Sequence, residues 1–197
     1  MKRLFLLFTL VVFALCANAQ SVTKFLGIPV DGTEYAFKNK LKAKGFKTLR
    51  YATDALEGEF NGRQVFVEVQ TVKDKVWRVI VSDVVTLSEE GIKNRFNNLL
   101  YQFKRNKKYH MVGDDPAIPE EEKIGNEMLV SKKRYEAAFL QYSEEDMKKG
   151  NNFETAMNAF NRLVWFIISE GSYDSYRIVM YYENRLNERM AVICNRI

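Results

Sequence analysis

The chain has 197 residues, of which 47% are hydrophobic and 13% aromatic, and its formal net charge is +5. This length and composition predict a folded protein with one core, and they exclude a low-complexity or disordered chain. One histidine and two cysteines are too few for a multi-Cys/His zinc site or a disulfide-rich scaffold.

Residues 1–19 have the three parts of a secretory signal peptide. Lys2 and Arg3 precede an apolar run over 4–15, and Ala17-Asn18-Ala19 follows as a cleavage sequence. The apolar run is shorter than the roughly 20 residues that a membrane span needs. No later segment approaches that length, so we expect no transmembrane segment. We expect export to the periplasm or the extracellular space, with cleavage after Ala19.

Cys16 leaves a lipoprotein open as the alternative, although Leu15 is not the small residue that a lipobox has before its cysteine.

Cleavage after Ala19 removes two cations and no acid, so the formal net charge of +5 falls to +3. A charge this small does not favour nucleic-acid binding, and we expect no nucleic-acid partner. Cys194 would then be the remaining thiol, and it could pack as a small hydrophobe, react, or form an interchain disulfide.

A short helix and a three-stranded meander are expected after the signal peptide. A modest apolar stripe predicts a helix over 33–44, with Asp31 and Glu34 forming a capping box and Gly45 ending it. Asn61-Gly62 separates two strand-like runs and is a strong hairpin signal. The run over 76–81 returns as the third strand.

The clearest helix follows Ser88, its expected cap. Its apolar stripe has the i, i+4, i+7, i+8 and i+11 spacing of one helix face and consists of Ile92, Phe96, Leu99, Leu100 and Phe103. Four cations gather at its C-terminal end, Lys104, Arg105, Lys107 and Lys108. Positive charge there is favoured by the negative end of the helix dipole, which accounts for this basic run. The segment 113–125 reads as an exposed acidic loop, and its acids lack the spacing of an EF-hand calcium loop.

The second part of the chain echoes the first. The segment 164–168 aligns with 65–69, and 176–180 aligns with 77–81, both at an offset of 99 residues. Internal duplication and the general likeness of buried hairpins both account for this. We expect one α+β domain over 20–197, in which helices pack on one face of an antiparallel sheet.

The two halves of this domain cover about 25–86 and 87–187, and each reads as helix, strand, strand, strand. An insertion at about 143–161 separates strands of the second half. Phe153, Met157 and Phe160 predict a short helix within it.

No motif in the sequence indicates catalysis or a cofactor. Glycine-rich phosphate loops, G-x-S-x-G, H-E-x-x-H and C-x-x-C are all missing, and His110 is the only histidine. We therefore assign no catalytic residue, no metal ligand and no cofactor. A carboxylate enzyme using Glu57, Glu136 or Glu183 stays open, because two acids on separate strands leave no local signature.

Aromatic residues gather in the last predicted hairpin. Tyrosine and tryptophan combine a large contact area with a polar tip, which favours them at recognition surfaces. Tyr176 and Tyr182 are an even number of residues apart along one strand, so their side chains point to the same face of the sheet, whereas Tyr181 points to the other face. Some of these rings must therefore lie in the core. The candidate binding residues are Trp165, Tyr173, Tyr176 and Tyr182.

The segments 25–33, 44–46, 56–62 and 181–187 resemble a family of small exported Bacteroidetes proteins, over nearly the whole mature chain. That resemblance implies no function. The paired helix-and-meander layout more remotely resembles the β-lactamase inhibitor protein and small outer-membrane assembly lipoproteins.

We expect a non-catalytic exported binding protein that engages another protein or an envelope component through its sheet face or loops. An inhibitor of a secreted hydrolase is a sharper form of this hypothesis. The alternative class is a carboxylate-based hydrolase of the cell envelope.

Overall fold

The structure, a computed structural model, describes residues 21–49 and 54–194, with side chains up to Arg189 in the last helix. The predicted signal peptide and Cys16 lie outside these residues, and so does the side chain of Cys194. No helix within the described ranges is both long and apolar enough to cross a bilayer.

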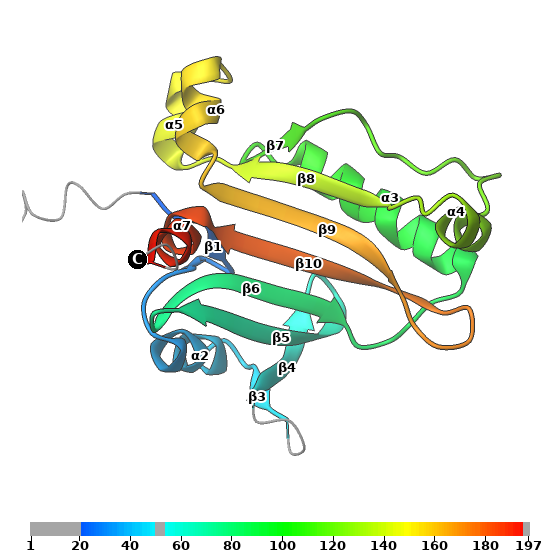
Figure 1. The fold of residues 1–197 in the computed structure, drawn as a ribbon, viewed down its shortest axis with the longest axis horizontal. Helices are drawn as coiled ribbons and strands as arrows, with labels where there is room; N and C mark the ends of the chain where they lie inside the picture. The colour runs from blue at the N-terminus through cyan, green and yellow to red at the C-terminus, as the bar shows by residue number, and fades with distance from the viewer. Residues whose placement is uncertain (1–20, 50–53, 195–197) are drawn as a thin grey trace, which may run out of the picture.

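An antiparallel sheet forms the centre of the fold, and its strands lie in the order β3-β4-β5-β6-β10-β9-β8-β7 (Figure 1). The strands are β3 (Lys47–Thr48), β4 (Ala55–Phe60), β5 (Arg63–Val72), β6 (Lys75–Asp83), β7 (Tyr109–Val112), β8 (Glu136–Gln141), β9 (Arg162–Glu170) and β10 (Tyr176–Asn184). A separate small ladder pairs β1 (Lys24–Phe25) with β2 (Ile28–Pro29). The expected α+β class with an antiparallel sheet is confirmed.

The strand order is symmetric about the central β6–β10 pair. Helix α2 (Glu34–Lys42) precedes β3 to β6, and helix α3 (Glu89–Arg105) precedes β7 to β10. The last strands of the two runs pair antiparallel, with Val81 opposite Met180. Internal duplication would give this layout, and the duplication itself stays a prediction.

The cap of the first helix lies two residues after the expected one. Thr33 caps α2 by accepting a hydrogen bond from the Ala36 N–H at 3.3 Å, because it directly precedes the first helical residue. The prediction of Asp31 as the cap is therefore wrong. The Asp31 carboxylate instead accepts hydrogen bonds from the Gly32 N–H and the Asn187 side chain.

The hairpin predicted at Asn61-Gly62 is confirmed. The two residues have φ of 52° and 72°, the left-handed pair that a type I′ turn needs between β4 and β5. The ladder between β5 and β6 shifts register after Gln70, so Trp77 is an extra residue on β6. Such a bulge changes the direction of the side chains beside it.

One face of the sheet carries the core. Alternate side chains of the central strands, such as Val67 and Phe166, are fully buried there, as strand geometry requires. Ser88 caps α3 as expected, and the Phe96 ring of that helix lies 5.1 Å from the Phe166 ring. The buried residues of α2 belong to the same cluster.

The structure contains elements that the sequence did not predict. They are the short strands β1, β2, β3 and β7, α4 (Ile124–Val130) at the end of the acidic segment, and α7 (Arg185–Cys194) after the last strand. The insertion forms two helices, α5 (Glu144–Lys149) and α6 (Phe153–Ala159). The apolar stripe that predicted α6 faces solvent, since Phe153 is 81% exposed, while Thr155 and Ala159 are buried.

Candidate functional site

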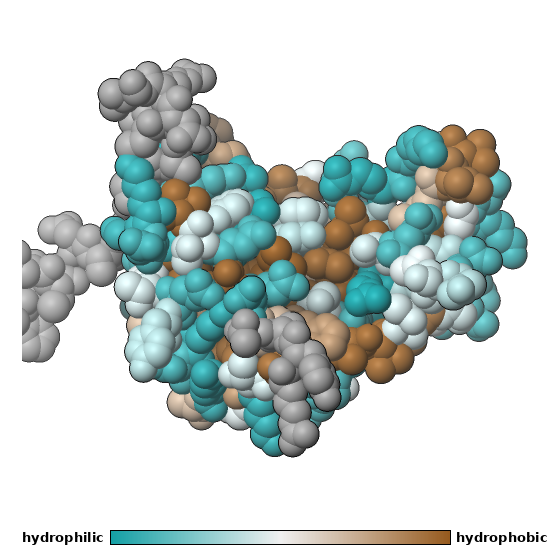
Figure 2. Space-filling model, turned by 60° about the horizontal axis from the view of Figure 1, so that its bottom comes forward, coloured by the Kyte–Doolittle hydropathy of each residue, from teal (hydrophilic) through white to brown (hydrophobic). Residues whose placement is uncertain are grey.

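The face of the sheet opposite the core carries half-buried apolar side chains. Helix α6 packs over one end of it, where Ala159 contacts Leu140. The partly exposed apolar residues of this open face are Phe66, Ile80, Leu163, Trp165, Ile167, Val179 and Tyr181. Apolar side chains grouped across the middle of one side of the molecule, with hydrophilic ones around them, are visible in Figure 2.

A continuous stack of aromatic and guanidinium groups crosses the open face. The Trp165 and Tyr181 rings are cross-strand neighbours and stack with centroids 4.0 Å apart. The Arg78 guanidinium lies 5.5 Å from the centroid of Tyr181 and 4.0 Å from that of Trp77. The bulge on β6 accounts for Trp77 and Arg78 lying side by side. We call these four residues the aromatic cluster.

Glu183 holds the aromatic cluster in place. Its side chain is only 3% exposed, and Oε1 accepts hydrogen bonds from Arg78 Nη2 at 2.6 Å and from Trp165 Nε1 at 3.0 Å. Arg185 Nε lies 3.5 Å from the other carboxylate oxygen. A buried charge with these partners fixes the rotamers around it. Glu183 is therefore a positioning residue for Arg78 and Trp165.

The three acids considered for catalysis lie on three different strands, β4, β8 and β10. Glu183 on β10 lies opposite Leu163 and Glu136 on β8 lies opposite Ile167, so two strand-to-strand spacings and four residues of β9 separate them. Ordinary sheet spacings put the Cα atoms of Glu183 and Glu136 about 16 Å apart, and both side chains line one hollow of about 330 Å³ on the open face. The carboxyl groups of a glycosidase pair lie roughly 5–10 Å apart. Glu136 forms an ion pair with Arg134, and Glu57 lies on β4 opposite Phe66.

The structure separates the four candidate binding residues. Trp165 lies on the open face, and Tyr173 is fully exposed in the β9–β10 turn. Tyr176 and Tyr182 point into the core, with 3% and 2% of their surface exposed, and Tyr182 also lines the cleft described below. The tyrosine that contacts Trp165 is Tyr181. The alternation of side chains along the strand had already predicted that Tyr181 and Tyr182 point to different faces of the sheet.

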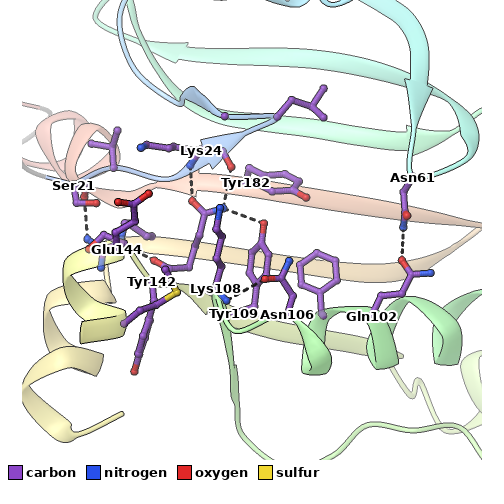
Figure 3. A pocket seen from close by; sticks show the side chains of 18 of the residues that line it. Ser21, Lys24, Asn61, Gln102, Asn106, Lys108, Tyr109, Tyr142, Glu144 and Tyr182 are labelled. Atoms are coloured by element: carbon purple, nitrogen blue, oxygen red, sulfur yellow. Dashed lines mark hydrogen bonds between the residues drawn. The ribbon is translucent and has the colours of Figure 1, made fainter. Parts of the chain in front are cut away.

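A cleft of about 700 Å³ lies at the end of α3 (Figure 3). Its walls are the N-terminal segment from Ser21, the β4–β5 turn, the last turn of α3 and the start of α5. Phe60 and Phe103 form part of its apolar lining, and Asn61 donates a hydrogen bond to Gln102 across it.

The polar groups at the floor of this cleft bind one another. Gln141 accepts a hydrogen bond from the Lys24 N–H at 2.6 Å and donates to the Lys24 carbonyl and to the Tyr109 hydroxyl. Burial raises the pKa of Tyr109 and of Tyr182, so both hydroxyls keep their protons at neutral pH. Neither phenol is therefore available as an anionic nucleophile or base.

Arg162 forms hydrogen bonds that hold the N-terminal segment beside the cleft. The side chain is buried, donates to the Gln141 and Ser21 carbonyls at 2.7 and 3.2 Å, and pairs with Asp146. Because these groups are satisfied within the chain, the cleft offers a ligand mainly its rim and apolar lining.

Neither metals nor known relatives indicate a function. Within the part of the chain that the structure describes, no group of three or more His, Cys, Asp or Glu side chains is placed to hold a metal ion. Comparisons with protein-family models, curated proteins and solved structures find no match to the chain. The function must therefore be inferred from the surfaces of the molecule.

Proposed function

We propose that this chain is an exported, non-catalytic binding protein that engages another protein through its open face. The observation that carries the proposal is the aromatic cluster, in which Trp165, Tyr181 and Arg78 stack on one partly exposed surface. Tryptophan, tyrosine and arginine are the residues that most often dominate the binding energy of protein interfaces.

The rigidity of the aromatic cluster supports the same role. Each ring or guanidinium contacts the next, and Glu183 holds both Arg78 and Trp165. Side chains that are already ordered lose less rotamer entropy when a partner arrives. The apolar residues around the cluster extend the contact area, and exposed apolar patches mark protein interaction sites in soluble proteins.

The acids support binding rather than catalysis. The Glu183 and Glu136 carboxylates are engaged by arginines, and four residues of β9 separate their positions in the sheet. Charged side chains fixed in this way can orient a partner and exclude wrong ones.

Site-specific photo-crosslinking tests the proposal. A photoreactive phenylalanine analogue is placed at Val179 on the open face, and at Tyr101, which is 58% exposed on α3, as the control. In cells that express the chain, Val179 should crosslink to a defined protein and Tyr101 should not. The Val179 crosslink should disappear when Trp165→Ala and Tyr181→Ala are added. Equal crosslinks from both positions, or a crosslink that survives both substitutions in a folded chain, would contradict the proposal.

A further inference from the structure

The strand β7 forms one outer edge of the large sheet (Figure 1). It pairs with β8 on its inner side, with His110 opposite Leu140 and Val112 opposite Ala138. Gly113 follows with φ of 84° and ends the strand. The second side of β7 has no strand beside it among the described residues.

The hydrogen-bond pattern shows which groups face outward. The Tyr142 N–H donates to the Lys108 carbonyl at 2.7 Å, which fixes the alternation of the β7–β8 ladder. In an antiparallel pair, bonded and non-bonded positions alternate. His110 and Val112 therefore bond to β8, while the N–H and carbonyl of Met111 point away from the sheet. Within the described chain, nothing forms a hydrogen bond to the backbone of Met111.

A basic groove of about 500 Å³ runs beside this edge. Met111 and His110 line it together with three cations at the end of α3, Lys104, Arg105 and Lys107. None of the described residues that line it is a carboxylate. Asp115 pairs with Lys104, whereas Arg105 and Lys107 form no ion pair within the described ranges.

We infer that the β7 edge binds an extended acidic segment of another polypeptide by strand addition. The outward N–H and carbonyl of Met111 would continue the ladder, and the side chains of Arg105 and Lys107 would pair with acidic residues of the added strand. Strand addition uses main-chain hydrogen bonds for affinity and side-chain contacts for specificity. The short edge limits the contact to a few residues.

Two features favour this occupant over a folded acidic surface or a small anion. An unpaired strand edge is a template for another extended chain, and the three cations lie along the same groove as that edge. This inference does not rest on the proposed role of the open face. Trp165 lies on β9, and β8 separates that strand from β7.

Fluorescence polarisation with labelled ten-residue peptides tests the inference. The probe alternates glutamate and threonine, one comparator alternates lysine and threonine, and the other is the glutamate–threonine peptide with every backbone N–H methylated. N-methylation keeps the acidic charge but removes every N–H that a ladder needs. The glutamate–threonine peptide should bind at least about tenfold more tightly than either comparator, a difference of about 1.4 kcal/mol. Equal binding of the two acidic peptides would show charge attraction alone and overturn strand addition.

Variants of the chain locate the site. Met111→Pro removes the outward N–H and should weaken binding about tenfold, close to one hydrogen bond. Lys107→Glu, an exposed change, should also weaken binding, whereas Trp165→Ala should not. Unchanged affinity in Lys107→Glu and in folded Met111→Pro would overturn the inference. If Met111→Pro does not fold, hydrogen exchange of the unsubstituted chain replaces this test. The peptide should slow exchange of the Met111 amide, and unchanged exchange would refute the inference.

Discussion

Tyr181 and Trp165 stack face to face across neighbouring strands, with ring centroids 4.0 Å apart and planes 10° apart. The next residue, Tyr182, points to the other face of the sheet, where its ring lies 5.0 Å from that of Phe25. Two consecutive tyrosines therefore belong to different parts of the molecule. One contributes to the open face, and the other contributes to the core.

Alanine substitutions should separate these two roles. Tyr182→Ala removes a buried ring and should lower the free energy of unfolding by about 3–5 kcal/mol. Tyr181→Ala removes a half-exposed ring and should lower it by about 1 kcal/mol. Urea unfolding monitored by circular dichroism measures both. Equal losses for the two variants would contradict the assignment of the faces.

A buried ion pair joins the sheet to α3. Arg95 Nε and Nη2 donate to the two Asp83 carboxylate oxygens at 3.2 and 3.3 Å, and both side chains are buried. Arg95→Ala leaves an unpaired buried carboxylate and should cost about 3–5 kcal/mol of stability. The double variant Asp83→Leu with Arg95→Met should be more stable than Arg95→Ala alone. A double variant less stable than the single one would show that the pair contributes net stability.

His110 should titrate below the usual range. Burial lowers its pKa from 6.5, and its ring stacks on Tyr142 with centroids 3.9 Å apart. The native state then binds this proton more weakly than the unfolded state does. The contribution of His110 to the free energy of unfolding should therefore fall as the pH drops from 6.5 toward the lowered pKa.

Proton NMR of the single imidazole measures the pKa of His110 directly. The variant His110→Phe keeps a ring on Tyr142 and removes the titration, so its stability should change less over this pH range. A native pKa above 6.5 would contradict the placement of the ring.

Gly58 is required by the close approach of Phe46. A Cβ at this position would lie 2.5–2.8 Å from three atoms of the Phe46 ring, which is itself 4% exposed. Gly58→Ala should therefore destabilise the protein by about 1–3 kcal/mol, although alanine usually suits a strand better than glycine. Adding Phe46→Leu should recover part of the loss in thermal unfolding. A neutral Gly58→Ala variant would contradict the packing.

Local signals were sufficient for much of the fold. The Asn61-Gly62 turn, the cap at Ser88 and the stripe of α3 depend on neighbouring residues, so the sequence was enough to predict them. The pairing of β6 with β10 depends on residues about 100 positions apart, and no local pattern indicates it. The strand β7 is too short to show a clear alternation.

The site was harder to predict than the fold. Strand parity correctly separated Tyr181 from Tyr182, but it could not show which of the two faces the helices cover. Trp77 joins the aromatic cluster through a bulge, which no sequence feature marked. The apolar spacing over α6 correctly predicted a helix but wrongly suggested which side of it is buried. Phe153 and Met157, which form this stripe, face solvent.

The affinity of the crosslinked partner for three forms of the chain tests the central claim most directly. Calorimetry should compare the unsubstituted chain with Tyr181→Ala and with Tyr173→Ala, since Tyr173 is fully exposed but lies in a turn outside the open face. Tyr181→Ala should weaken binding by about 2 kcal/mol or more, and Tyr173→Ala should leave it nearly unchanged. A folded Tyr181→Ala variant that binds the partner as tightly as the unsubstituted chain would contradict the account.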